Sequence, residues 1–434
     1  MIYSFINTRC HMLPLSSPRR HDVDNLRSLA VLMLVPFHTA RLFDATPWHM
    51  KDAAAPYGAA AALLRAIDLW QMPLLFLLAG IAAALALERR GALAFLRERV
   101  ARLLLPLGFG ILVLVPPQVW VERVTPAAPL RQSAPVFEGG FVEFLPQAFV
   151  CCYPAASFSW HHLWFLPYLF LYAALLALVS RAGDGAGLAR WTAARPWRLL
   201  LPIAPLVAGE VALRPVFPGS HDLVMDWANH AHYGLLVVLG WWFGRNPVLG
   251  AAVARHLPLF AGLAACAAAS WFAALPAARG GLGVLEVALP GRLALRAVAE
   301  WLVLLALLGA AARWLALPIR PLAAFAPLSM PFYMLHQTVI VLLGWALFGW
   351  LDAPVWKGLT IAGATVALSL AGAAMATRSP FLRPLFGLGA SRRAAAARPA
   401  RSVPHVPASQ FEPPFAASIL GVGLLDMRPA HRDR

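Results

Sequence analysis

Hydrophobic residues in this 434-residue chain gather into long runs that short polar segments separate. Ten such runs are predicted, over residues 26–43, 59–87, 103–120, 163–179, 199–213, 227–243, 257–275, 297–312, 330–350 and 355–375. Several approach the length of about 20 residues that a helix needs to cross a bilayer. In the second run, Arg65 and Asp68 indicate that the first part lies in the interface and that only 72–87 crosses. The pattern predicts an all-α polytopic integral membrane protein with about ten transmembrane helices.

Composition agrees with this prediction, because 60% of the residues are hydrophobic and 13% are charged, whereas a soluble domain carries roughly 25% charged residues. The formal net charge of +16 raises the question of nucleic-acid binding. However, the basic residues fall between the apolar runs instead of forming one patch, and no common nucleic-acid motif occurs. We therefore expect the lipid bilayer as a partner and no nucleic acid.

The loop charges predict the orientation of the chain. With the N-terminus inside, the inner loops and tails carry 25 of the 36 Lys and Arg residues and the outer loops carry 9. This asymmetry predicts that both termini are cytoplasmic. We expect a basic cytoplasmic tail at 1–23, a ten-helix membrane domain at 24–385, and an Arg/Ala/Pro-rich cytoplasmic tail at 386–434 that is disordered. The longest loop, 121–162, then faces outward, which suits an extracytoplasmic substrate.

The first apolar run carries ionisable residues along one predicted helix. Arg27 and His38 would lie about 16 Å apart and within about 20° of the same face, and Asp24 about 40° from His38. If Arg27 marks the interface, His38 sits near the middle of a hydrocarbon core about 30 Å thick, where an ionisable side chain indicates a functional site. Pro36 predicts a kink beside it. The alternative is a histidine that only hydrogen-bonds to a neighbouring helix.

A second cluster, Arg97, Arg99 and Arg102, lies on the predicted inner side before the third run. These arginines are either plain positive-inside anchors or a clamp for a phosphorylated donor, because guanidinium groups bind phosphate oxygens bidentately. A third cluster opens the ninth run, where Tyr333 and His336 are three residues apart and share a helix face. A structural hydrogen bond to another helix is the alternative explanation there.

On the predicted outer side, His162 and Trp164 precede the fourth run, and Asp226 and His230 open the sixth. Such residues are ordinary at a membrane boundary, and they are equally suited to stack on and hydrogen-bond a sugar. Asp226 and His230, at i and i+4, together with His232 also suggest a metal site. No further ligand is placed by the sequence, and the four cysteines contain no C-x-x-C pair, so no metal site is predicted.

At these residues the sequence resembles the membrane acyltransferase 3 family, the integral-membrane O-acyltransferases of bacteria. The resemblance rests on Arg27-x10-His38, Arg97-x-Arg99, WFLPYLFLY from Trp164 and PFYMLHQ from Pro331. DNLRSLAVLM, WQMPLLFLLAG and HLWFLPYLFLY look especially like the glucan biosynthesis protein C subgroup, which is associated with succinylation of periplasmic glucans.

The resemblance implies a multi-pass enzyme of the bacterial inner membrane that moves an acyl group, acetyl or succinyl, from cytoplasmic acyl-CoA to an extracytoplasmic carbohydrate hydroxyl. It implies His38 as the catalytic histidine and Arg27, Arg97 and Arg99 in donor binding, with acyl-CoA as co-substrate and no bound cofactor. A neutral imidazole buried in a low dielectric is a suitable base for such a transfer.

The principal alternative is a transporter or flippase for an anionic or phosphorylated solute, in which the histidine would serve a proton path and the arginines would bind the anion. Transporters usually contain two pseudo-symmetric halves with matching broken helices, and no such pairing is visible. A purely structural membrane protein fits poorly with a buried His–Arg–Asp group. We therefore expect the enzyme.

Overall fold

The computed structural model describes residues 20–52, 58–125, 136–350 and 353–389, and every regular element among them is a helix. The α-helices are α1 (His21–Leu32), α2 (Leu34–Ala40), α3 (Gly58–Asp68), α4 (Gln71–Arg90), α5 (Ala92–Arg99), α6 (Leu105–Phe109), α7 (Pro116–Val124), α8 (Phe141–Ala148), α9 (Phe165–Leu178), α10 (Ala186–Ala193), α11 (Ile203–Leu213), α12 (Trp227–Arg245), α13 (Pro247–Arg255), α14 (Leu257–Ala274), α15 (Leu289–Trp314), α16 (Arg320–Phe325), α17 (Ser329–Leu347), α18 (Pro354–Arg378) and α19 (Leu382–Leu385). The predicted all-α class is confirmed.

The helices account for the predicted spans. Eight helical runs in the described part of the chain are long and apolar enough to cross a membrane, and α12 with α13, bent by 96°, makes a ninth if the pair is one span. The remaining predicted run, 26–43, is divided between α1 and α2. The second run breaks between α3 and α4, and α4 begins at Gln71, next to the predicted start of the crossing part at 72. The chain is therefore a polytopic membrane protein.

Small residues bring α4 and α12 into close contact. A Cβ atom added at Gly240 would lie 2.0 Å from the carbonyl oxygen of Leu77, and one added at Gly80 would lie 2.1 Å from that of Val237. Gly244, one turn further along α12, faces α4 in the same way. Within a bilayer, where apolar side chains gain little by leaving lipid, such small-residue contacts let helix backbones pack closely. α4 and α12 are therefore closely packed against each other beside α1.

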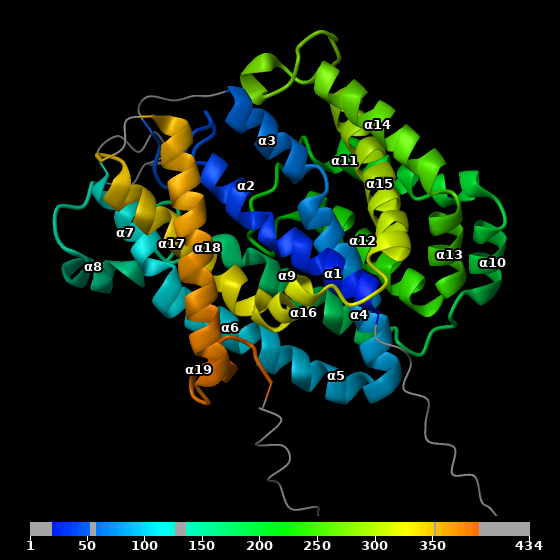
Figure 1. The fold of residues 1–434 in the computed structure, drawn as a ribbon, viewed down its shortest axis with the longest axis horizontal. Helices are drawn as coiled ribbons and strands as arrows, with labels where there is room; N and C mark the ends of the chain where they lie inside the picture. The colour runs from blue at the N-terminus through cyan, green and yellow to red at the C-terminus, as the bar shows by residue number, and fades with distance from the viewer. Residues whose placement is uncertain (1–19, 53–57, 126–135, 351–352, 390–434) are drawn as a thin grey trace, which may run out of the picture. The chain divides into compact units, whose positions relative to one another are not determined.

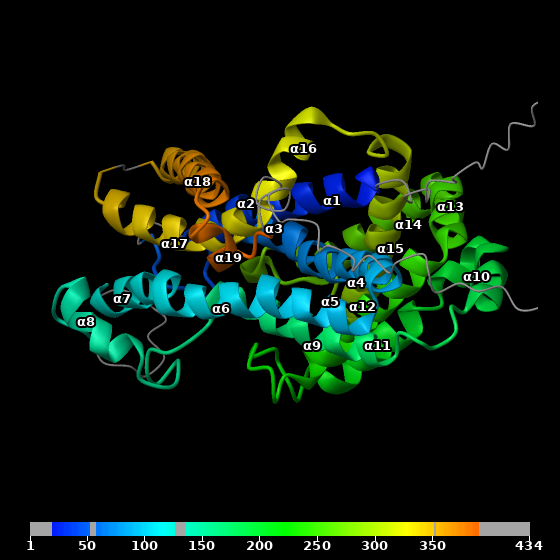
Figure 2. The same ribbon diagram turned by 90° about the horizontal axis from the view of Figure 1, so that it is seen from below.

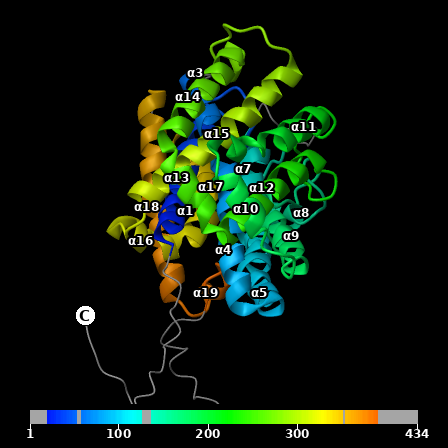
Figure 3. The same ribbon diagram turned by 90° about the vertical axis from the view of Figure 1, so that its right-hand side faces the viewer.

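α1 and α2 lie in the middle of the molecule, with other helices on both sides of them and at the two ends. Figure 1 shows α1 and α2, in dark blue, between the α17–α18 pair on one side and α14–α15 on the other, and Figure 2 shows the same order. Figures 1 and 3 place α5 and α19 at one end, and α3 and the link between α14 and α15 at the opposite end. Two of the segments predicted to be cytoplasmic thus lie at one end, and two of those predicted to be outside lie at the other.

The predicted tails at 1–23 and 386–434 fall almost wholly outside the described residues. At the C-terminal boundary, the ring of Phe386 is buried and lies 5.2 Å, centroid to centroid, from that of Phe109. The packing of the membrane domain thus continues past residue 385. The domain boundaries and the disorder of the tail otherwise stay predictions.

Candidate active site

His38 lies in the wall of a cavity of about 570 Å³, which we call the histidine cavity because His38, His49, His161, His162 and His221 line it. The His38 ring stacks with Trp48 at a centroid distance of 6.0 Å and lies 5.0 Å from the ring of His336. Its Nδ1 atom is buried and has no hydrogen-bond partner within the described ranges. Buried polar atoms are nearly always paired, so this nitrogen is available to a molecule in the cavity.

The backbone breaks beside His38, as the sequence predicted. α1 ends at Leu32 and α2 begins at Leu34, and Pro36 has no N–H with which to bond the carbonyl of Leu32. Because of this break, the position of Arg27 relative to His38 does not follow from straight-helix geometry alone, and the single stripe stays a prediction. The two side chains line different cavities.

Arg27 contributes to a second cavity, of about 430 Å³, which we call the arginine cavity because Arg27, Arg99, Arg102 and Arg383 line it. The Nε atoms of Arg27 and Arg99 are buried and lack hydrogen-bond partners within the described part of the chain. One Arg27 Nη atom donates to Asp24 over 3.0 Å, as expected for a supporting residue. Guanidinium donors without partners suit an anionic ligand such as a phosphate.

The π-helical turn Val100–Leu104, between α5 and α6, helps to aim two of these arginines. Such turns widen a helix locally and occur often at functional sites. Arg97 does not join them, because it is exposed and lines neither cavity. Two residues along a helix correspond to about 200°, so Arg97 and Arg99 point in nearly opposite directions. The predicted donor role of Arg97 therefore finds no support here, whereas Arg383, which the sequence analysis did not select, lies in the cavity.

The two cavities adjoin, because Leu34, Met72 and Tyr333 line both of them. Tyr333 donates a hydrogen bond to the carbonyl of His162 over 2.7 Å. His336 is fully buried, with Nδ1 2.6 Å from the carbonyl oxygen of Tyr333 and Nε2 without a partner among the described residues. Of the predicted supporting pair, Tyr333 thus lies where the two cavities meet, whereas His336 lines neither cavity and its ring lies 5.0 Å from that of His38.

Two of the four acceptor-side candidates line the histidine cavity, namely His162 and Trp164. His162 Nε2 lies 3.0 Å from the carbonyl oxygen of Met334. Trp164 stacks on His221, which sequence reasoning missed, at a centroid distance of 4.0 Å. Burial lowers the pKa of His221 and so favours its neutral form.

Asp226 and His230 do not line the histidine cavity, so their predicted acceptor role stays a prediction. The Asp226 carboxylate accepts hydrogen bonds from Tyr168 over 2.5 Å and from Asn229 over 2.8 Å. His230 Nε2 lies 2.7 Å from the carbonyl oxygen of Leu223. Neither residue lines the histidine cavity or the arginine cavity. Their side chains satisfy local polar groups at the start of α12, because buried donors and acceptors at a helix end need partners.

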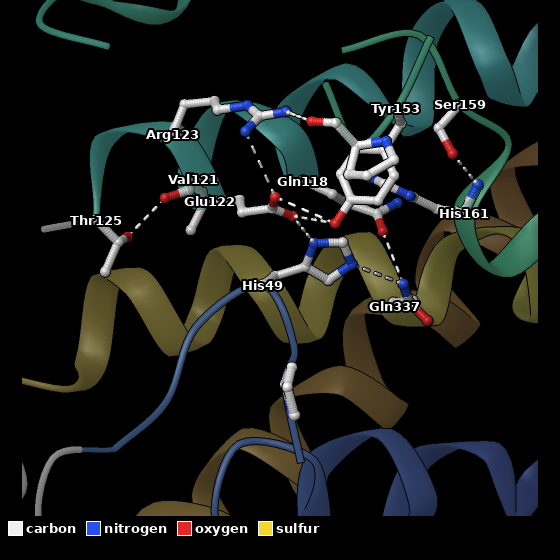
Figure 4. Close-up of polar contacts among 12 residues, drawn as sticks. His49, Gln118, Val121, Glu122, Arg123, Thr125, Tyr153, Ser159, His161 and Gln337 are labelled. Carbon is white, nitrogen blue, oxygen red and sulfur yellow. Dashed lines mark hydrogen bonds and ion pairs between the residues drawn. The ribbon is translucent and has the colours of Figure 1, made fainter. Parts of the chain in front are cut away.

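A polar network at the wall of the histidine cavity was also not predicted from the sequence (Figure 4). His49 Nδ1 is 2.9 Å from Glu122 Oε2, and the hydroxyl of Tyr153 donates to both oxygens of Glu122 over 3.2 and 3.3 Å. Burial and the Glu122 charge raise the pKa of Tyr153, which therefore stays protonated. His49, Glu122 and His161 also form the one group in the described residues whose ligand atoms are close enough to share a metal ion.

Comparison with known proteins identifies the family. A family model described as an acyltransferase domain matches residues 20–377. No curated protein and no solved structure matches the chain. The match covers α1 to α17, all of α18 except Arg378, the histidine cavity, and the lining of the arginine cavity other than Arg383 and residues 387–389. It favours acyl transfer over the transporter alternative. The chain belongs to the acyltransferase 3 family and is a multi-pass membrane enzyme that transfers acyl groups.

Proposed function

We propose that this enzyme transfers an acetyl or succinyl group from cytoplasmic acyl-CoA to a hydroxyl of an extracytoplasmic carbohydrate, such as a periplasmic glucan, across the bacterial inner membrane. One observation carries the proposal: a cationic cavity and an aromatic, histidine-rich cavity adjoin at Leu34, Met72 and Tyr333. This arrangement offers two substrates with different chemistry separate routes to one reaction centre. The resemblance to the glucan biosynthesis protein C subgroup supports the choice of acyl group and acceptor.

The arginine cavity suits the donor. Coenzyme A carries several phosphates, and Arg27 and Arg99 each keep a buried Nε donor that no described residue satisfies. Arg102, whose Nε lies 3.0 Å from Glu98 Oε1, and Arg383 add positive charge. The rest of the lining is largely apolar, with side chains such as Leu75 and Leu169, and can accept the uncharged arm that carries the thioester.

The histidine cavity suits a sugar acceptor. Trp48, Tyr153 and Trp164 supply flat aromatic surfaces, and His162 and Gln337 supply polar groups. Pockets for small molecules commonly combine aromatic walls with a few convergent polar groups that fix orientation.

His38 performs the chemistry in this proposal. Its neutral imidazole removes the proton from the acceptor hydroxyl as the oxygen attacks the thioester carbonyl, and the thiolate of coenzyme A leaves. General-base catalysis of this kind typically contributes about 10²–10⁴-fold in rate. Leu34, one turn before His38 on α2, lines both cavities, which supports delivery of the thioester to this histidine.

Two measurements test the proposal. Purified protein in lipid nanodiscs, given acetyl-CoA or succinyl-CoA and a β-glucan oligosaccharide, should release free coenzyme A thiol and add one acyl mass to the sugar. Mass spectrometry of periplasmic glycans from wild-type and deletion strains should then show loss of the same modification. If neither acyl-CoA is consumed with any of a panel of glycans, and the glycan profiles of both strains are identical, the assignment of donor and acceptor is wrong.

A further inference from the structure

Three side chains with metal-binding atoms meet at the wall of the histidine cavity, namely His49, Glu122 and His161 (Figure 4). One nitrogen or oxygen atom of each lies within 4.8 Å of the others. His49 Nδ1 is 2.9 Å from Glu122 Oε2, and the centroids of the two imidazoles are 4.7 Å apart. The residues come from the loop after α2, from α7 and from the turn before α9, so the tertiary fold assembles the group.

Burial makes this group unusual. His49 is 6% exposed and Glu122 is 1% exposed. The Nε2 atom of His161 is buried and has no hydrogen-bond partner within the described ranges. A buried polar atom without a partner calls for a ligand, a water or an ion.

The surroundings already orient two of the three side chains. Gln337 Nε2 lies 3.2 Å from His49 Nε2, and the hydroxyl of Tyr153 contacts both oxygens of Glu122. Contacts of this kind fix the orientation of ligands in metal sites. Arg123 lies 4.0 Å from the second oxygen of Glu122, which leaves Oε2 as the oxygen that faces His49.

We propose that His49, Glu122 and His161 bind a divalent transition-metal ion of the Zn²⁺ class. Two imidazoles and one carboxylate are a ligand set of zinc sites that keep a further coordination position open. The ion takes the position between His49 Nδ1 and Glu122 Oε2, and the imidazole proton of His49 moves to Nε2, so that a neutral imidazole coordinates the ion. The Gln337 amide then turns its oxygen toward this N–H. His49 and His161 line the histidine cavity, so the open position faces the space that holds the acceptor in the proposed function.

A hydrogen-bonded network without a metal is the competing explanation. It accounts for His49, which lies between Glu122 and Gln337. It does not account for His161, whose Nε2 stays unsatisfied although the His49 ring is adjacent. A metal ion gives all three side chains a partner, and we therefore prefer it.

Zinc binding to the full-length protein tests this inference directly. The protein, purified in detergent with an affinity tag that contains no histidine and stripped with a chelator, is titrated with zinc sulfate alone. Elemental analysis after desalting should find one zinc per chain, and competition with a zinc-binding dye gives the affinity. Because even residues behind the ligands typically contribute about 10–100-fold in affinity, Glu122→Gln and His161→Asn should each weaken binding by more than about 100-fold. The control His256→Asn should bind as the wild type does.

X-ray absorption at the zinc edge tests the site in the wild-type protein, so its result does not depend on whether the variants fold. The wild-type spectrum should show two imidazoles and oxygen ligands at about 2.0–2.2 Å. A spectrum without imidazole, a wild type that retains no zinc, or equal affinity in wild type and both ligand variants would overturn the proposal. His38→Gln separates it from the proposed function, because that variant should lose acyl transfer and keep its zinc.

Discussion

The arginine cavity and the histidine cavity adjoin, but their linings differ in chemistry. The first is lined by four guanidinium groups and apolar side chains, and the second mainly by imidazoles and aromatic rings, with Arg41, Arg65 and Asp68 as its charged residues. Charge-assisted hydrogen bonds hold an anion strongly, whereas aromatic walls and neutral hydrogen bonds suit an uncharged polyol. The difference teaches how one membrane enzyme can keep two substrates apart until they meet beside Tyr333, which lines both cavities.

The prediction that the two cavities receive their substrates from opposite sides of the membrane can be tested in an experiment with an all-or-none outcome. The charge asymmetry of the loops predicts that α5 and the C-terminal tail are cytoplasmic and that the loop 121–162 is outside. Reporter fusions after Arg131 and after Arg393 should therefore report opposite sides of the membrane. The same side for both fusions would contradict the ten-span topology and the proposed entry of the donor from within.

The largest kinetic effect is expected at His38, the general base of the proposed mechanism. His38→Gln keeps hydrogen-bonding capacity but cannot take up a proton at working pH, so the turnover rate should fall by about 10²–10⁴-fold. Thermal melting of the purified variant should stay near that of the wild type, because the polar group is retained. A folded His38→Gln protein that transfers acyl groups at the wild-type rate would show that this histidine is structural.

Variants of Arg97 and Arg99 form a matched pair that tests whether the arginine cavity binds the donor. Arg99→Ala removes a buried guanidinium and should raise the KM for acyl-CoA by about 10–100-fold, since a hydrogen bond to a charged group is worth about 1.5–3 kcal/mol. Arg99→Lys should recover part of the loss, because lysine lacks the planar fork. Arg97→Ala, on the exposed face of α5, should leave the KM unchanged. Equal effects at Arg97 and Arg99 would argue against a donor site in this cavity.

The aromatic wall predicts a smaller, acceptor-specific effect. Trp164→Ala should raise the KM for the carbohydrate about 3- to 10-fold, since an aromatic contact is worth about 0.5–1.5 kcal/mol beyond its buried area. The KM for acyl-CoA should not change, because Trp164 does not line the arginine cavity. Trp191→Ala, at an exposed position on α10, is the control. A change in donor KM alone would reverse the assignment of the two cavities.

The same comparison shows what the sequence can predict. Apolar runs revealed the helices because each span is a local pattern about 20 residues long. His38 and the arginines were selected because a single ionisable residue in an apolar run, or three in one short segment, is visible by itself. Arg97 lies outside the arginine cavity that Arg99 and Arg102 line, because clustering in sequence does not specify the helix face, which π-helical turns further along α5 to α7 also alter.

The histidine cavity was harder to predict because distant segments build it. Trp48 and His49, Glu122, and Tyr153 lie in three separate stretches with no shared motif. For Asp226 and His230 the sequence could not separate an acceptor role from a local one, since polar residues at a membrane boundary serve equally as partners for local backbone groups. The loop after α2 is the least predictable part, because its residues carry no helical period.

The smallest effect that we predict concerns Lys51 in that loop, which should make the free energy of unfolding depend on pH. Lys51 contacts Asp44 and the carbonyl of Arg41, and burial lowers its pKa to about 8 although Asp44 opposes the shift. A lysine in the unfolded chain titrates near about 10.4. Between these values the unfolded chain binds more protons, so this lysine makes the free energy of unfolding rise with pH from about 8 to about 10.4. Other groups titrate in the same pH range, so the wild type is compared with the variant Lys51→Met. The melting temperature of the wild type, relative to that of the variant, should rise by a few degrees as the pH rises. Parallel curves for the two proteins would show that Lys51 has an ordinary pKa.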